Sequence, residues 1–289
     1  MASLKHFAVL ILFGAFSLVF KVLPVSGARR VGAWIGTLTR ILLPSQGRRV
    51  RSHLEKAFPT WGSRKITRCI RENFRHYGMT FAELYHLEKL YPSVEISGIH
   101  HLSGTGVVLV TGHCGNWELM ARTIARRCGG LTVVAREAYL DTLNDFLVGL
   151  RKKGGVETIL RGSSDSPRQL LSAVKEGRTL GMLIDQDTKV EGIFVPFFNH
   201  PAHTPVGAAR LALKYGIPSV TGFIHRTPSG GHILHFDDPI QSEGHTEETL
   251  TALLTRRIED QVRRHPTQWV WVHRRWKKVP SREEVNSGS

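Results

Sequence analysis

The chain has 289 residues and carries 39 Lys and Arg against 24 Asp and Glu, a formal net charge of +15. This length suits one sizeable domain with an appendage, and the charge favours a polyanionic partner: nucleic acid, an anionic membrane surface or a phosphorylated substrate. The three cysteines show no paired spacing, which argues against a disulfide framework or a zinc ribbon.

Two apolar runs open the chain, over residues 7–20 and 31–44. The first is short for a spanning helix, which needs about 20 apolar residues, and a cleaved signal peptide ending near residues 26–28 is the alternative. The second run has basic flanks that suit an anionic leaflet on the cytoplasmic side. We therefore predict a membrane anchor over residues 1–30, followed by a body that lies in the cytoplasm.

Helical spacing of apolar residues continues from about residue 52 to residue 90. Residues 40–89 hold 11 basic and 4 acidic side chains. This excess fits a solvated charged face and a face for lipid headgroups equally well. We assign residues 31–92 to a helical, basic part of the body that faces the membrane.

Strand and helix patterns alternate after Pro92. Strand-like runs occupy residues 107–111, 132–136, 157–160, 179–184 and 219–223, and helical patterns lie around 116–128, 139–153, 166–176, 205–215 and 246–264. The fourth helix has Thr204 as N-cap, Pro205 at its first position and Gly216 just past its end. Such alternation predicts an α/β fold, a mostly parallel sheet flanked by helices, over residues 93–289.

The stretch TGHCGNWEL follows the run 107–111, so His113 sits where α/β sheets bind ligands, beyond the carboxyl end of a strand. Asn116 can cap the next helix and Glu118 would lie in its first turn. Across such a turn a carboxylate can reach the imidazole, fix its tautomer and leave the other nitrogen as a base. A glutamate that only complements the helix dipole, beside a surface histidine, is the plainer interpretation.

The pattern His-x-x-x-x-Glu resembles the signature of the glycerolipid acyltransferase superfamily. Longer segments are similar to the late acyltransferases of lipid A biosynthesis, in family order over nearly the whole chain: LPSQGRRVRSHLEKAFP, VVAREAYLDTLNDFLVGLRKKGG, LIDQDTKVEGIFVPFFNHPAHTPVGAARLALKYGIP and HPTQWVWVHRRWK. The resemblance implies transfer of a fatty acyl chain from an acyl carrier protein thioester to a hydroxyl of a glycolipid at the inner membrane. It also implies His113 as general base and Glu118 as its partner, without an acyl-enzyme.

Further residues are expected to bind substrate. They are Asn116, Arg136, Arg151, Arg161, Asp185 and Asp187. Each arginine could instead be a surface residue. The two aspartates could hold a metal or form a structural turn; the resemblance implies instead that they order the site or bind the acceptor, by contact with His113 or an arginine. The run FVPFF over 194–198 could line an acyl groove or be a cluster of core aromatics. We expect no cofactor, no bound metal and no nucleic acid partner.

Two other functions compete with this one. A relative of the same superfamily could acylate another membrane acceptor, such as a phosphatidylinositol mannoside or an ornithine-type lipid. A basic, non-catalytic protein could bind membrane or nucleic acid through charge alone, and it would tolerate loss of His113. A covalent route through Cys114 is disfavoured, because nothing in the sequence around it indicates a lowered thiol pKa.

Overall fold

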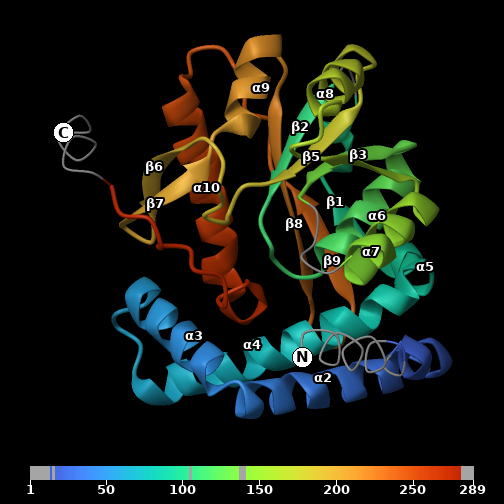
Figure 1. The fold of residues 1–289 in the computed structure, drawn as a ribbon, viewed down its shortest axis with the longest axis vertical. Coiled ribbons are helices and arrows are strands. Elements are labelled where there is room, and N and C mark those ends of the chain that lie inside the picture. The colour runs from blue at the N-terminus through green and yellow to red at the C-terminus, as the bar shows by residue number, and fades with distance from the viewer. Residues whose placement is uncertain (1–13, 15–16, 104–105, 137–140, 281–289) are drawn as a thin grey trace.

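The computed structural model describes residues 14, 17–103, 106–136 and 141–280 (Figure 1). Its main sheet has seven strands in the order β1-β9-β8-β2-β5-β3-β4. The strands are β1 (Glu95–Ser97), β2 (Val107–Thr111), β3 (Leu131–Ala135), β4 (Val156–Leu160), β5 (Thr179–Leu183), β8 (Ser219–Arg226) and β9 (His232–Phe236). All neighbours are parallel except β8 and β9. The predicted α/β class with a mostly parallel sheet is confirmed.

Helices cover both faces of this sheet (Figure 1). They are α5 (Leu87–Leu90), α6 (Trp117–Cys128), α7 (Asp141–Lys153), α8 (Ser166–Lys175), α9 (Gly207–Tyr215) and α10 (Glu247–Arg264). Successive side chains of a strand point to opposite faces. Accordingly Val108 and Val110 enter a core shared with α9 and α10, whereas Val107 and Leu109 enter a core shared with α6. Burial on both faces explains why β2 is apolar throughout.

Three N-terminal helices, α2 (Val25–Leu42), α3 (Pro44–Ala57) and α4 (Ser63–Glu83), form a layer at one end of the molecule (Figure 1). Helices α2 and α4 run antiparallel and touch through glycines. A Cβ atom on Gly78 would lie 1.9 Å from the carbonyl oxygen of Gly32, and one on Gly36 would lie 2.0 Å from the carbonyl oxygen of Phe74. The missing side chains therefore allow the two backbones to meet.

The segment before α9 differs from the prediction. An unpredicted hairpin of β6 (Gly192–Phe197) and β7 (His200–Pro205) extends through Pro205, which was wrongly expected to begin the helix, and α9 begins only at Gly207. Thr204 was therefore wrongly expected to cap this helix: it pairs with Ile193 in the hairpin and its hydroxyl accepts a hydrogen bond from Arg275. The predicted end is confirmed, because Gly216 adopts the left-handed conformation there.

Most of the predicted anchor lies outside the described residues, which omit 1–13 and 15–16. Helix α2 begins at Val25, inside the predicted anchor, and continues past its expected end at residue 30. Among the residues that the structure describes, no helix has the length and hydropathy needed to cross a bilayer.

Candidate active site

The turn after β2 places His113 at the carboxyl edge of the sheet. Gly115 adopts a left-handed backbone with φ of 60°, and a Cβ atom there would lie 2.0 Å from the carbonyl oxygen of Ile224. Its N–H donates to the carbonyl of Gln268 at 2.8 Å, and the Tyr77 hydroxyl donates to the carbonyl of His113 at 3.1 Å. Only glycine fits this close approach. The hydrogen bonds with Gln268 and Tyr77 hold the turn on its two sides.

The partner of His113 is Asp185. Strands β2 and β5 pair in parallel with Thr111 opposite Leu183, so the residues two positions beyond each strand end come side by side. The His113 imidazole Nδ1 lies 2.8 Å from one carboxylate oxygen of Asp185, and the backbone N–H of His113 donates to the other at 2.7 Å. Trp269 donates its indole N–H to the same carboxylate at 2.7 Å.

This carboxylate stays ionised although it is 1% exposed. Burial alone would raise the pKa of Asp185, but the adjacent imidazole and the N–H donors of His113 and Trp269 lower it to about 2. An ionised carboxylate only accepts hydrogen bonds, so Nδ1 must carry the proton. In the neutral ring the Nε2 atom is then left with its lone pair, as a general base requires.

Glu118, expected to hold the imidazole, has a different partner. Arg151 donates to both oxygens of its carboxylate, at 2.9 and 2.5 Å. Glu118 lies in the first turn of α6, where its side chain meets the last turn of α7. The predicted His113–Glu118 pairing therefore needs correction: Asp185, reached across the sheet, takes that place, and Glu118 fixes Arg151 instead.

Asn116 caps α6, as its position predicted, but its side chain does not face substrate. The amide oxygen accepts from the backbone N–H of Leu119 at 3.0 Å, and the amide nitrogen donates to Glu83 at 2.9 Å. The side chain is 1% exposed and both of its polar atoms are satisfied within the protein. Its expected role in substrate binding is replaced by a structural one.

Glu83 belongs to a buried polar cluster behind the turn. Arg226 donates to both of its carboxylate oxygens, at 2.9 and 2.6 Å, and Arg29 donates to one at 2.6 Å. Burial would raise the pKa of Glu83, but Arg226 and His232 hold it well below the usual value. The cluster connects α2, α4, β8 and the N-cap of α6.

His113 opens into a cavity of about 750 Å³. Its lining comprises Arg49, His113, Trp117, Val134, Ala135, Arg136, Arg151, Arg161, Leu183, Gln186, Asp187, Thr188, Lys189, Val272, His273, Arg274 and Lys277. Among these residues seven are Arg or Lys and one is acidic, so the cavity suits an anionic ligand. The structure thus brings the three predicted arginines, Arg136, Arg151 and Arg161, to the same cavity as His113.

Asp187 also lines the cavity, but its carboxylate is engaged. It accepts from the backbone N–H of Lys278 at 2.9 Å and lies 3.4 Å from the ring of His203. Its side chain is only 2% exposed. Asp187 therefore secures the C-terminal segment against the hairpin, and its binding of substrate stays a prediction.

The C-terminal segment supplies site residues to which the sequence assigned no role. His273, Arg274 and Lys277 line the cavity, and Trp269 binds Asp185. Burial lowers the pKa of His273 to about 4, so this ring is neutral at pH 7. The run HPTQWVWVHRRWK was noted as a family segment, and its mixture of cations and aromatics near a histidine is the signal that could have placed it at the site.

The thiol of Cys114 is unsuited to carry an acyl group. The side chain is buried, and burial, followed by the nearby Asp185 carboxylate, raises its pKa well above the ordinary value. Because the thiolate is the nucleophilic form, this environment disfavours a covalent route.

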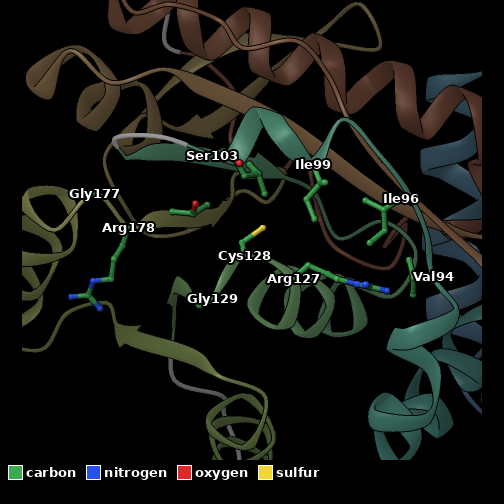
Figure 2. Close-up of a pocket in the computed structure, with 12 residues that line it drawn as sticks. Val94, Ile96, Ile99, Ser103, Arg127, Cys128, Gly129, Gly177 and Arg178 are labelled. Carbon is green, nitrogen blue, oxygen red and sulfur yellow. The ribbon is translucent and has the colours of Figure 1, made fainter.

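A second cavity, of about 680 Å³, lies at the opposite edge of the sheet, near the starts of β3 and β5. Figure 2 shows its lining, which combines Val94, Ile96 and Ile99 with Arg127 and Arg178. None of the described residues that line it is a His, Asp or Glu. It therefore contains no candidate base comparable to His113.

Comparison with known proteins identifies the family of the chain. A sequence profile of the family described as bacterial lipid A biosynthesis acyltransferase matches residues 2–278. The chain is 26% identical over 217 residues to a phosphatidylinositol mannoside acyltransferase of Mycobacterium tuberculosis, covering 69% of this chain and 67% of the relative. It is 25% identical over 265 residues to the lipid A biosynthesis palmitoleoyltransferase of Escherichia coli, covering 86% and 85%.

Among solved structures, the 1-acyl-sn-glycerophosphate acyltransferase of Thermotoga maritima aligns with a TM-score of 0.41 and 15% identity, over 84% of this chain and 99% of that one. The family match extends over nearly the whole chain and includes the turn that carries His113. The protein therefore belongs to the bacterial lipid A biosynthesis acyltransferase family and is an acyltransferase.

Proposed function

We propose that the protein transfers a fatty acyl chain from an acyl carrier protein thioester to a hydroxyl of a lipid A precursor, with His113 as the general base. The observation that carries the proposal is the buried Asp185 carboxylate on Nδ1 of an imidazole that opens into a cationic cavity. The family and its lipid A and phosphatidylinositol mannoside relatives support acyl transfer to a glycolipid.

The chemistry follows from the geometry. An alcohol is a poor nucleophile at neutral pH, so Nε2 of His113 removes its proton as the oxygen attacks the thioester carbonyl. Asp185 stabilises the imidazolium that forms. The tetrahedral intermediate then expels the thiolate, which takes the proton from the imidazolium, leaving an ester, a free thiol and a neutral histidine. Cations that line the cavity stabilise the oxyanion in between.

The positive charge of the cavity supports a phosphorylated glycolipid as the acceptor. Arg136 and Arg161 lie close enough for their charges to interact, and loss of hydration together with this repulsion lowers the pKa of Arg161. Two like charges held together are unfavourable unless an anion joins them. In this proposal, an acceptor phosphate provides that anion while Arg151, fixed by Glu118, lies beside the reacting centre.

The exposed apolar face of α2 supports a location at the inner membrane. Trp34 is 77% exposed, Ile41 60% and Leu42 66%. Large apolar side chains gathered on one exposed helix face indicate an interaction surface, and the lipid substrates of the relatives make a bilayer its occupant. The orientation would keep the active cavity on the cytoplasmic side, where acyl carrier protein is found.

Purified protein with acyl carrier protein thioesters and lipid A precursor tests the proposal, with product mass as the readout. We expect His113→Ala and Asp185→Asn each to lower kcat about a hundred-fold to ten-thousand-fold, the usual contribution of an oriented general base. Cys114→Ala is the control and should retain turnover. Normal turnover by His113→Ala would contradict the base, and a dead Cys114→Ala with an acylated wild-type protein would contradict direct transfer.

A second acceptor is favoured by the similarity to phosphatidylinositol mannoside acyltransferase. Offering that glycolipid and the lipid A precursor in one reaction, with acyl carrier protein and coenzyme A thioesters compared as donors, separates the possibilities. Exclusive acylation of the mannoside would replace the lipid A proposal. Absence of transfer to either lipid would contradict both acceptors.

A further inference from the structure

A cleft of about 390 Å³ lies between the end of α2 and the start of α4, away from the active cavity. It is lined by Arg40, Ser63, Arg64, Thr67, Arg68 and Arg71. Antiparallel packing explains the cluster, because the last turn of α2 meets the first turns of α4. Four guanidinium groups thus share one small concave surface.

Little within the protein neutralises this charge. Among the described residues, no carboxylate lies within 4.0 Å of Arg40, Arg64 or Arg68, and Arg71 meets only the exposed Glu72, at 3.2 Å. The Nε atom of Arg40 is buried without a hydrogen-bond partner in the part of the chain that is described. Arg64, Arg68 and Arg71 are exposed, so their guanidinium groups are free to donate to an external anion in the cleft.

The start of α4 adds to the positive potential. Its N-cap, Gly62, offers no side-chain acceptor, and its first turn has no acidic residue. The backbone N–H groups of that turn and the helix dipole therefore favour an anion at the same place as the arginines. Ser63 and Thr67 supply hydroxyl groups to the cleft.

The surroundings of the cleft identify the anion. Arg40 is followed directly by Ile41, Leu42 and Leu43, which are 60%, 66% and 48% exposed. A water-soluble acidic partner would leave these side chains in water, whereas a bilayer buries them and presents its phosphates at the adjoining depth. The combination of an apolar face and an arginine cleft fits an anionic phospholipid.

We propose that the Arg40, Arg64, Arg68 and Arg71 cleft binds the phosphate headgroup of an anionic phospholipid of the bilayer. The inference rests on the membrane location in the proposed function. It identifies a lipid contact that would hold the layer of α2, α3 and α4 on the bilayer surface. Guanidinium groups suit this role because they donate two parallel hydrogen bonds to a phosphate, which lysine does not.

Flotation of the full chain with vesicles tests the site. Vesicles of phosphatidylcholine alone and with phosphatidylglycerol would be compared for wild type and for the triple variant Arg64→Gln, Arg68→Gln, Arg71→Gln. We expect the phosphatidylglycerol-dependent partition to fall about five-fold for each arginine removed, equivalent to about 1 kcal/mol each. The matched control, Arg127→Gln, Lys152→Gln, Lys175→Gln, loses the same charge from exposed positions on α6, α7 and α8 and should bind nearly as the wild type does.

The corresponding triple arginine-to-lysine variant keeps the charge and should bind between wild type and the glutamine variant. Equal binding by the lysine and wild-type proteins, or an equal loss in the control, would overturn a specific phosphate site. Unchanged vesicle binding by the glutamine variant with a raised KM for acyl carrier protein thioester in detergent would assign the cleft to the carrier protein instead.

Thermal unfolding of each variant checks that it is folded. His113→Ala should float like the wild type, because flotation requires no turnover. If vesicle binding depends on the cleft but the protein transfers no acyl chain, only the proposed function is contradicted. If the protein transfers an acyl chain in detergent but the cleft variants bind vesicles as the wild type does, only this inference is contradicted.

Discussion

At the scale of single residues, the identity of the carboxylate beside His113 decides which nitrogen of its imidazole carries the proton. Asp185 reaches both the ring and the backbone of His113, and Trp269 fixes its second oxygen. Glu118 has no part in that contact because Arg151 binds it on both oxygens. The carboxylate that contacts His113 therefore belongs to Asp185, 72 positions away in the sequence, and not to Glu118, five positions away.

The lowered pKa of Asp185 predicts an acid-dependent loss of stability. Its pKa falls from 3.8 to about 2, so the unfolded chain binds the proton more tightly than the folded one. The stabilisation is full above the unfolded pKa and is lost as pH falls toward about 2. We expect about 2 kcal/mol from this shift.

Urea unfolding of wild type and Asp185→Asn at neutral and acidic pH measures this effect. The difference in unfolding free energy should be largest at neutral pH and shrink on acidification. Asp238, whose side chain is 93% exposed, is the control, and its asparagine variant should follow the wild type. A difference that grows on acidification would contradict the ionised state of Asp185.

At the scale of elements, the contact between α2 and α4 connects the exposed apolar face to the active turn. The glycine contact sets their separation, and Arg29 of α2 reaches Glu83 of α4, which in turn holds the N-cap of α6. The buried side of α2 consists of the small residues Ala28, Gly32, Ala33 and Gly36. This packing keeps the catalytic turn at a fixed position relative to the helical layer.

Gly78→Ala should destabilise the protein, because the new Cβ would collide with the backbone of Gly32. Overpacking of this kind costs about 1–3 kcal/mol, measured as the free energy of unfolding. Gly47 in α3 has open space around it, so Gly47→Ala should instead be neutral or stabilise by up to about 1 kcal/mol. Equal effects of the two variants would show that close packing at Gly78 does not matter.

Glu83→Gln should also be strongly destabilising. Removing the charge leaves Arg226, which is 8% exposed, without its ion pair in a buried site. Breaking a buried pair costs about 3–5 kcal/mol, whereas the exposed Glu72→Gln control should cost less than about 1 kcal/mol. Similar unfolding free energies for both variants would rule out a role for the cluster in holding the α6 N-cap.

At the scale of the whole molecule, the layer of α2, α3 and α4 joins an exposed apolar face to the cavity that contains His113. Trp34 and Ile41 lie on the exposed face of α2. Arg49 of α3 lines the cavity and donates to the carbonyl of Val272, so the helical layer contributes directly to the active site. The layer is thus both a candidate membrane face and one wall of the cavity.

Trp34→Ser with Ile41→Ser should weaken partition into phosphatidylcholine vesicles at least about ten-fold, because two large apolar side chains no longer enter the bilayer. Turnover with substrate in detergent should be retained. Val279→Ser, at an exposed valine outside this layer, is the control and should partition normally. Unchanged partition of the double variant would contradict the proposed membrane face.

The sequence by itself determined most of the local elements and the position of His113 just beyond a strand end. Runs of apolar residues predicted β2, β3, β4, β5 and β8, because buried parallel strands are apolar on both sides, and helical periodicity predicted α6 and α10. The same runs did not reveal β1 and β9. His113 was placed correctly because the end of β2 is a local feature. The membership of the chain in its family likewise followed from its residues.

Only the tertiary structure decided which side chains meet. The order of strands makes β5 the neighbour of β2, and their register brings Asp185 to His113. The β6–β7 hairpin and the path of the C-terminal segment past Asp185 and the cavity depend on contacts between distant parts of the chain. Periodicity reports the environment of a residue along its own element, whereas pairing depends on the register between elements.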